Sequence, residues 1–531
     1  MAYKHKKIFV FILSMLCSVL SLSTQASTAD HSQFEVLKGP FSSGQEVTAA
    51  CLSCHTEAAH QVMQTRHWTW EYENPLTGEV LGKKTMLNGF CIGDRSNEAF
   101  CHSCHIGYGW QDNTFDFNEP TNIDCLACHN TGEYKKIAGM AGHPSYERQE
   151  WPKGSGKFIE AIDLIGVAQQ IGSTSRETCG SCHFYGGGGD GVKHGDLDSS
   201  LVHPSRELDV HMASDGLNFS CSDCHQTDKH QVPGSRISMA AAPSGGAMMR
   251  GQHPSEYQNP ASCQSCHGND PHKGDLMHSS RLNQHADIIA CQTCHIPAFS
   301  RGGVPTRMGW DWSVAGKLTE EGKPFFTYDE EGNITYDSRK GSFNLGQNVE
   351  PVYQWFNGDV SYIQPDSQID PSDRVAINRF LGEPGSADAR IWPFKRFEGR
   401  QPYDTELKTL LVPQVAIPND TSFWYNFDWD KALLAGAESS GRPFSGHYDF
   451  VDTQMDWPIT HMVAPKEQAL DCASCHTSEG RLAGVKGIWM PGHHRQSLLD
   501  QAGFLLAGLI LLGAAGHGSM RFVTRNKKSG G

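Results

Sequence analysis

The pattern Cys-x-x-Cys-His occurs eight times in the 531-residue chain. A chain of this composition would contain roughly 0.03 copies by chance, so the repetition has a chemical cause. Two thiols at this spacing add to the two vinyl groups of one haem, and the adjacent histidine binds the iron. The pattern therefore predicts eight covalently attached haems of the c type.

The predicted attachment sites account for 16 of the 18 cysteines. The attachment cysteines are Cys51, Cys54, Cys101, Cys104, Cys125, Cys128, Cys179, Cys182, Cys221, Cys224, Cys263, Cys266, Cys291, Cys294, Cys472 and Cys475. The proximal iron ligands are His55, His105, His129, His183, His225, His267, His295 and His476. Cys91 is left over in the exported chain, and we expect it to be a small buried thiol.

Other uses of Cys-x-x-Cys do not explain the pattern. Zinc sites combine two such units and do not need a histidine directly after each of them. A thioredoxin-like redox motif normally occurs once per chain, and a disulfide framework does not predict the histidine.

Each iron also needs a second axial ligand or an open position. The 27 histidines of the chain exceed the sixteen that eight bis-histidine haems would use, so most haems are expected to be low-spin electron carriers. The distal candidates, chosen by their position near a motif, are His67, His194, His211, His230, His272, His285 and His461. Any one of them could instead be an ordinary hydrogen-bonding histidine.

A glycine-rich stretch, Gly186–Asp198, is the most informative segment outside the motifs. Its sequence is GGGGDGVKHGDLD, and we call it the glycine loop. Successive glycines let a backbone approach a flat ring or a substrate closely. A flexible linker would need the glycines but not the charged residues Asp190, Lys193 and His194 that follow them.

Seven motifs lie between Cys51 and His295, which forces the haems into near contact and favours an electron wire. The fold is predicted to be mainly α-helical and loop-rich, organised around eight haems, with little β-structure. We expect a haem-binding region at 27–300 and a haem-shielding region with the eighth motif at 301–495. Lys431 to Ala437 are expected to form a short helix.

Both ends of the chain carry apolar segments. Residues 1–26 read as a signal peptide, with Lys4, Lys6 and Lys7 before an apolar run; the alternative is an uncleaved anchor. Residues 496–520 are predicted to form a single transmembrane helix, and the basic tail 521–531 to stay in the cytoplasm. The alternative for this helix is a buried or interfacial one. The body is thus expected in the periplasm, anchored to the inner membrane. Its net charge of −15 argues against nucleic-acid binding.

The eight motifs, the glycine loop, the segment Cys291-Gln-Thr-Cys-His-Ile-Pro297 and the long interval before the last motif resemble the octahaem tetrathionate reductase family. The resemblance covers roughly residues 45–490. It implies that the second haem, attached at Cys101 and Cys104, is catalytic. It also implies that Lys193 is the distal ligand of that haem, with Asp190 close by. Spacing alone would leave Lys153 and Lys157 as rivals of Lys193.

A lysine ligand suits a displaceable position. Keeping a lysine neutral at pH 7 costs about 4.6 kcal/mol, which weakens its net bond to iron compared with that of an imidazole. A displaced Lys193 would become a cation beside an anionic substrate, and Asp190 could hold it or manage a proton.

The resemblance implies an anaerobic respiratory oxidoreductase that converts tetrathionate and two electrons into two thiosulfates. The partners would be a small inorganic oxyanion and an electron donor, either a quinol-oxidising membrane cytochrome or a periplasmic cytochrome. The membrane helix departs from the soluble family pattern and favours the membrane donor. A nitrite or hydroxylamine reductase, and an electron-transfer cytochrome without catalysis, are the alternative functions.

Overall fold

Short helices carry the attachment motifs. The computed structural model describes residues 29–74, 77–88, 90–234, 261–494 and 497–528. The predicted signal peptide therefore lies outside the described residues. The α-helices before the sheet are α2 (Gly44–Leu52), α3 (Ala58–Met63), α4 (Arg66–Thr69), α5 (Glu98–Cys101), α6 (Leu126–His129), α7 (Leu164–Gln169), α8 (Arg176–His183), α9 (Cys221–Cys224), α10 (Cys263–His267), α11 (Leu276–His285) and α12 (Cys291–His295).

Polar residues start several of these motif helices. The side chain of Ser43 caps α2, and Ser175 forms a capping box with Thr178 at the start of α8. The side chain of Ser262 caps α10 by accepting a hydrogen bond from the backbone N–H of Ser265. A capping oxygen satisfies backbone N–H groups that a helix of one or two turns leaves unpaired. These caps stabilise the first turn of each of these helices, so a short helix is enough to hold the motif.

The segment after α12 forms a large sheet. Its strand order is β11-β14-β13-β5-β8-β7-β6, and β9 pairs with β13 beside this path. The strands are β5 (Thr306–Asp311), β6 (Phe326–Tyr328), β7 (Ile334–Asp337), β8 (Gly341–Gly346), β9 (Val352–Phe356), β11 (Val375–Ala376), β13 (Arg390–Asp404) and β14 (Tyr448–Pro458). The prediction of little β-structure is therefore wrong.

Smaller strand pairs complete the β-structure. They are β1 (Tyr72–Glu73) with β2 (Val80–Leu81), β3 (Gln149–Glu150) with β4 (Phe158–Ile159), and β10 (Val360–Tyr362) with β12 (Asn378–Phe380). The remaining helices are α13 (Phe423–Asn426), α14 (Trp429–Ser440), α15 (Cys472–Cys475) and α16 (Ser497–Lys528). Helix α14 confirms the predicted helix at Lys431 to Ala437.

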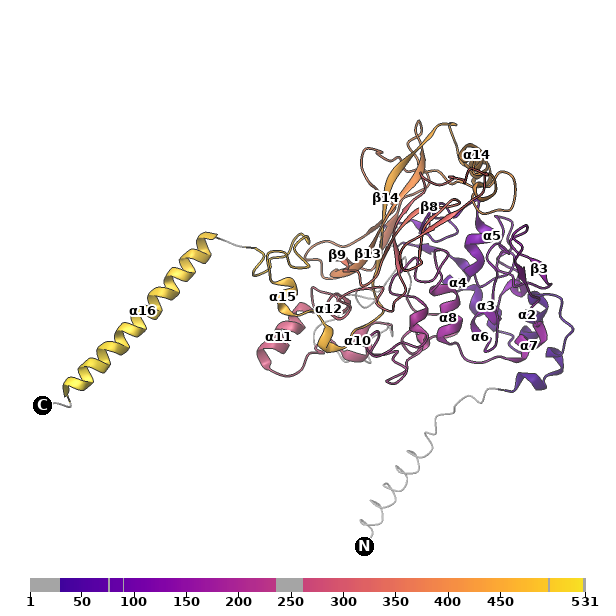
Figure 1. Cartoon of the computed structure of the whole chain (residues 1–531). Helices are drawn as coiled ribbons and strands as arrows, with labels where there is room; N and C mark the ends of the chain where they lie inside the picture. The colour runs from indigo at the N-terminus through magenta and orange to yellow at the C-terminus, as the bar shows by residue number, and fades with distance from the viewer. Residues whose placement is uncertain (1–28, 75–76, 89, 235–260, 495–496, 529–531) are drawn as a thin grey trace, which may run out of the picture.

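The sheet and the motif helices lie in separate parts of the molecule. Figure 1 shows the long strands β13 and β14 rising above a row of short helices that runs from α2 to α15. The largest apolar core joins the two parts, because it contains Phe90 from the helical half together with Trp310, Phe397 and Trp457 from the sheet. The sheet thus packs against the motif region through this shared core. A haem-shielding role for residues 301–495 stays a prediction.

Helix α16 is the one helix of the described residues with the length and composition to cross a membrane. The apolar stretch Leu498–Phe522 has a mean hydropathy of 1.8, and none of it is buried against the rest of the protein. Figure 1 shows α16 projecting away from the body. A helix of this hydropathy that buries nothing in its own chain is suited to a lipid environment.

Candidate functional site: eight attachment motifs and a buried lysine

Seven of the eight motif histidines face a second histidine. The ring centroids in these pairs are 6.0–6.4 Å apart. Two metal–nitrogen bonds of about 2 Å, with about 1 Å from each nitrogen to its ring centre, account for this separation. The pairs are His55 with His31, His183 with His67, His129 with His230, His267 with His211, His225 with His461, His295 with His272, and His476 with His285.

Hydrogen bonds leave one ring nitrogen available in many of these pairs. Nδ1 of His129 lies 3.1 Å from the carbonyl oxygen of Gly172, and Nδ1 of His225 lies 2.8 Å from that of Pro233. On the distal side, Nδ1 of His272 lies 2.9 Å from an Asn283 oxygen. An acceptor at Nδ1 orients the ring and leaves Nε2 to bind a metal. The donor sets therefore fit iron bound between paired imidazoles.

The motif thiols are also placed for attachment. The described cysteines form no disulfide. Thiols of different motifs lie together, as in the contacts of Cys51 in the first motif with Cys125 in the third, and of Cys179 in the fourth with Cys221 in the fifth. Further neighbours are Cys104 with Cys182, Cys128 with Cys179, Cys224 with Cys266, Cys263 with Cys291, and Cys294 with Cys475. The attachment sites thus form one continuous series, with the second site beside the fourth.

His105, in the second motif, is the exception. Its Nε2 lies 2.7 Å from the carbonyl oxygen of Trp68, and its ring packs against Trp68, Trp70 and Trp110. Among the ring contacts of the described residues, it faces no second histidine. His67 is the nearest candidate along the chain, but it is already paired with His183. Burial lowers the pKa of His105 to about 3, so the ring is neutral.

Lys193 is buried close to this exceptional motif. Its side chain is 3% exposed, and its Nζ lies 4.4 Å from the ring centre of Trp457. Its aliphatic chain passes Gly186, directly after the motif helix α8, whose Cys182 thiol contacts Cys104 of the second motif. Lysine burial of this extent is unusual unless the amine has a specific role.

A second buried lysine fixes the backbone at Lys193. Lys395 on β13 is fully buried, and its Nζ donates hydrogen bonds to the carbonyl oxygens of Val192 and Lys193, each at 2.9 Å. It also donates to the hydroxyl of Thr306 on β5. Strands β13 and β5 of the sheet thus hold the backbone of the glycine loop. Sequence inspection missed Lys395, because nothing near it in the chain marks it as a partner of the loop.

The acidic residues of the glycine loop have structural contacts. Asp190 accepts hydrogen bonds from the backbone N–H (2.8 Å) and the hydroxyl of Ser199, which closes the loop on itself. Asp196 accepts from the backbone N–H groups of Thr460 (2.8 Å) and His461 (3.1 Å) and lies 3.3 Å from Nδ1 of His461. One loop therefore carries Lys193 and also orients His461, which faces the motif histidine His225. The role of Asp190 in moving a proton stays a prediction.

Proximity to a motif in the sequence does not by itself identify the histidine that faces a motif histidine. His194, a predicted distal candidate, packs edge-on against Trp457, with 5.5 Å between the ring centres, and its role as an iron ligand stays a prediction. His31, which faces His55, was not a candidate, because it lies well before the first motif and just after the predicted signal peptide. The rivals Lys153 and Lys157 are exposed.

Asp198 should make stability fall with rising pH. Burial raises the pKa of this carboxyl from 3.8 to about 6, although hydrogen bonds from Ser200 oppose the shift. The folded state then binds a proton on Asp198 more tightly than the unfolded state does. The free energy of unfolding therefore falls as the pH rises from about 4 to about 6. We expect Asp198→Asn to raise the free energy of unfolding by about 2–3 kcal/mol at pH 7.5 and very little at pH 4.

Urea unfolding of both proteins, followed by circular dichroism across this pH range, measures the effect. The difference between the variant and the parent isolates Asp198 from other titrating groups. Equal stabilities at pH 7.5 would contradict the prediction.

Comparison with known proteins supports these observations. The family model described as "Cytochrome c bacterial" matches residues 307–479. The crystal structure of an octahaem cytochrome c from Shewanella oneidensis is 41% identical, covers 86% of this chain and 95% of its own, and superposes with a TM-score of 0.73. The chain belongs to the octahaem cytochrome c family. This octahaem cytochrome c is therefore a multihaem redox protein with covalently bound haem c.

A more distant relative is an uncharacterised protein from Archaeoglobus fulgidus. It is 22% identical over an alignment of 276 positions, and the match covers 43% of this chain and 91% of that protein. It adds no statement about activity.

Proposed function

We propose that this protein carries eight haems and reduces tetrathionate to thiosulfate at the second attachment site, with Lys193 as a displaceable ligand. The observation that carries the proposal is the difference between His105 and the other seven motif histidines. A haem held by two imidazoles has no open position for a substrate, whereas a site without a second histidine can bind one.

The reduction of tetrathionate to thiosulfate requires two electrons and no proton. Tetrathionate has a central S–S bond, and adding two electrons breaks it and releases two thiosulfate anions. The bound haem would supply these electrons one at a time at its iron. The continuous series of attachment sites, in which Cys104 contacts Cys182 of the fourth site, gives the second site a supply of electrons.

The residues of the chain would position and release the amine. Lys395 and the sheet fix the backbone at Lys193, so that only the side chain of Lys193 needs to move. Rings of Trp457 and Phe90 border its Nζ, and they exclude water from the amine. A dry site strengthens the attraction between a displaced lysine cation and an anionic substrate.

We also propose that the body lies in the periplasm and that α16 anchors it in the inner membrane. The support is the length and exposure of Leu498–Phe522 together with the basic residues that follow. An anchored reductase would take electrons from a quinol-oxidising membrane partner without a diffusing carrier.

An anaerobic assay with reduced viologen dye tests the proposed activity. The purified holoprotein is mixed with tetrathionate, nitrite or hydroxylamine, and dye oxidation is followed. We expect tetrathionate to oxidise the dye fastest. Faster turnover of nitrite or hydroxylamine would favour a nitrogen substrate. The absence of turnover with all three would favour a plain electron-transfer cytochrome.

A further inference from the structure

Two half-buried cations, Arg307 and Lys340, lie near Lys193. The guanidinium carbon of Arg307 on β5 lies 3.8 Å from the ring centre of Phe343 and 4.5 Å from that of Trp310. Lys340, in the turn between β7 and β8, is joined to the same cluster, because Nε1 of Trp310 donates to its carbonyl oxygen at 2.7 Å.

This cation group and Lys193 share one aromatic wall. The ring of Phe90 lies 6.3 Å from that of Trp310 on one side, and 5.8 Å from Nζ of Lys193 on the other. Cys91, the next residue, interacts electrostatically with Arg307, Lys340 and Lys193, and also with Cys101 of the second motif. The cations are therefore next to the second attachment site.

Two hydrogen-bond donors beside Lys193 have no acceptor among the described residues. Nη1 of Arg307 and Nε1 of Trp457 are both buried, and neither has a hydrogen-bond partner among the described residues. Burial lowers the pKa of Arg307 to about 10, and the like charge of Arg307 adds to burial in lowering the pKa of Lys340. The carboxylate of Asp337 opposes this lowering of the pKa in both cations, but Nη1 of Arg307 still has no acceptor among the described residues. A desolvated guanidinium with an unused donor is costly unless a further anion meets it.

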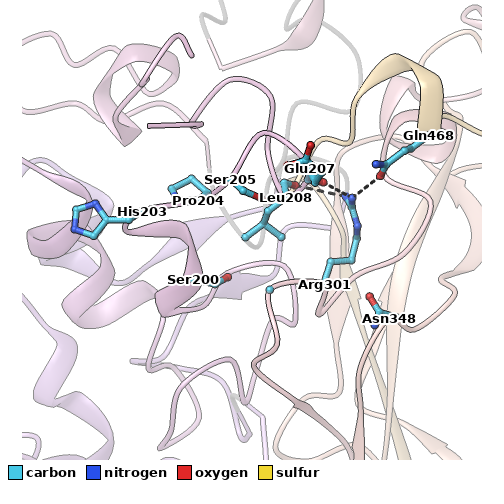
Figure 2. Close-up of a pocket in the computed structure, with 10 residues that line it drawn as sticks. Ser200, His203, Pro204, Ser205, Glu207, Leu208, Arg301, Asn348 and Gln468 are labelled. Carbon is cyan, nitrogen blue, oxygen red and sulfur yellow. Dashed lines mark hydrogen bonds between the residues drawn. The ribbon is translucent and has the colours of Figure 1, made fainter. Parts of the chain in front are cut away.

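The arginine of a nearby pocket gives a useful contrast. A pocket of about 590 Å³ is lined by Arg301, Ser200 and His203, among other residues (Figure 2). Arg301 already donates to the carbonyl oxygen of Met462 at 2.9 Å and to the side chain of Gln468 at 3.0 Å. Its guanidinium is thus occupied by the protein, unlike that of Arg307.

We propose that Arg307 and Lys340 form the binding site for the sulfonate end of the anionic substrate, beside Lys193. The inference rests on the proposed function for the position of the substrate, and it assigns residues that the haem sites do not use. Trp457 would add a neutral donor. A haem propionate is the other anion that could meet these groups. However, Cys91 neighbours the attachment cysteine Cys101, and thioethers form at the ring edge opposite the propionates.

Binding of tetrathionate to the oxidised full-length holoprotein tests the proposal, because an oxidised protein cannot turn the substrate over. Isothermal titration calorimetry with potassium tetrathionate is done on the parent, Arg307→Gln, Lys340→Gln and the matched control Arg301→Gln. Loss of one charged hydrogen bond should raise Kd by about tenfold or more in the first two variants and leave the control unchanged. Lys340→Gln, in a turn, keeps the test available if Arg307→Gln does not fold.

The viologen assay separates this inference from the proposed function. If tetrathionate is not reduced, a higher KM for nitrite but not for uncharged hydroxylamine in Arg307→Gln still supports an anion site. An unchanged Kd for tetrathionate in both variants overturns the proposal. A shifted haem reduction potential with an unchanged Kd also overturns it and assigns the cations to a propionate.

Discussion

Replacing Lys193 with histidine should lower tetrathionate turnover by about a hundredfold or more. A histidine has a reference pKa near 6.5, so an imidazole binds iron at pH 7 without the deprotonation cost of a lysine. The substrate would then have to displace a stronger ligand. The variant would also lose the cation that Lys193 places beside the substrate, and a single charged group of this kind is worth about 10²–10³ in rate.

The measurement is kcat in the anaerobic viologen assay, together with the visible and electron paramagnetic resonance spectra of the oxidised protein. The variant should lose the signal of a lysine-ligated haem and keep the seven bis-histidine signals. Lys157→His is the matched control, since Lys157 is an exposed rival in another glycine-containing stretch. Full activity in Lys193→His, or loss of activity in Lys157→His, would contradict the assignment.

Removing residues 497–531 should move the protein from the membrane fraction to the soluble periplasm. The deleted helix α16 contains the apolar stretch Leu498–Phe522, and no part of this stretch packs against the body. A membrane-spanning helix holds a protein almost irreversibly, whereas the acidic body has no affinity of its own for anionic lipid. The haems and the viologen-linked activity should be unaffected, because no attachment motif is lost.

Fractionation of cells, followed by haem staining and the viologen assay on each fraction, gives the result. A graded control is Leu509→Arg with Leu511→Arg, because each charge near the middle of the span costs about 2.5–3.5 kcal/mol for insertion. We expect that variant to be partly or wholly soluble. A truncated protein that stays in the membrane fraction would refute anchoring by α16 and point to the N-terminal segment.

Local chemistry explains why the attachment motifs could be identified from the sequence. Two thiols and a histidine within five residues bind one haem, so no distant part of the chain is needed to define Cys101 or His105 as a site. The caps of the short motif helices, such as Ser175, are equally local. Family membership and covalent haem c agree with these motifs. The assignment of Lys193 as an iron ligand came from the family resemblance, and it stays a proposal.

The sheet was missed because its strands do not look like strands in the sequence. β13 is buried on both faces along much of its length and shows no simple alternation of apolar and polar residues. It also contains Pro393 and Pro402, which usually argue against a central strand. Its stability comes from pairing with β14, β5 and β9, which lie up to tens of residues away.

By itself the sequence predicted the residues that attach haem, since that chemistry depends on neighbours in the chain, and the family match shows covalently bound haem c. The tertiary structure decided which histidine faces which, because His230 and His129 are brought together across a hundred residues. It also decided that His105 differs from the other motif histidines, and that Lys395 and Arg307 from the sheet lie beside Lys193. These relations arise from packing between distant segments, which local spacing does not encode.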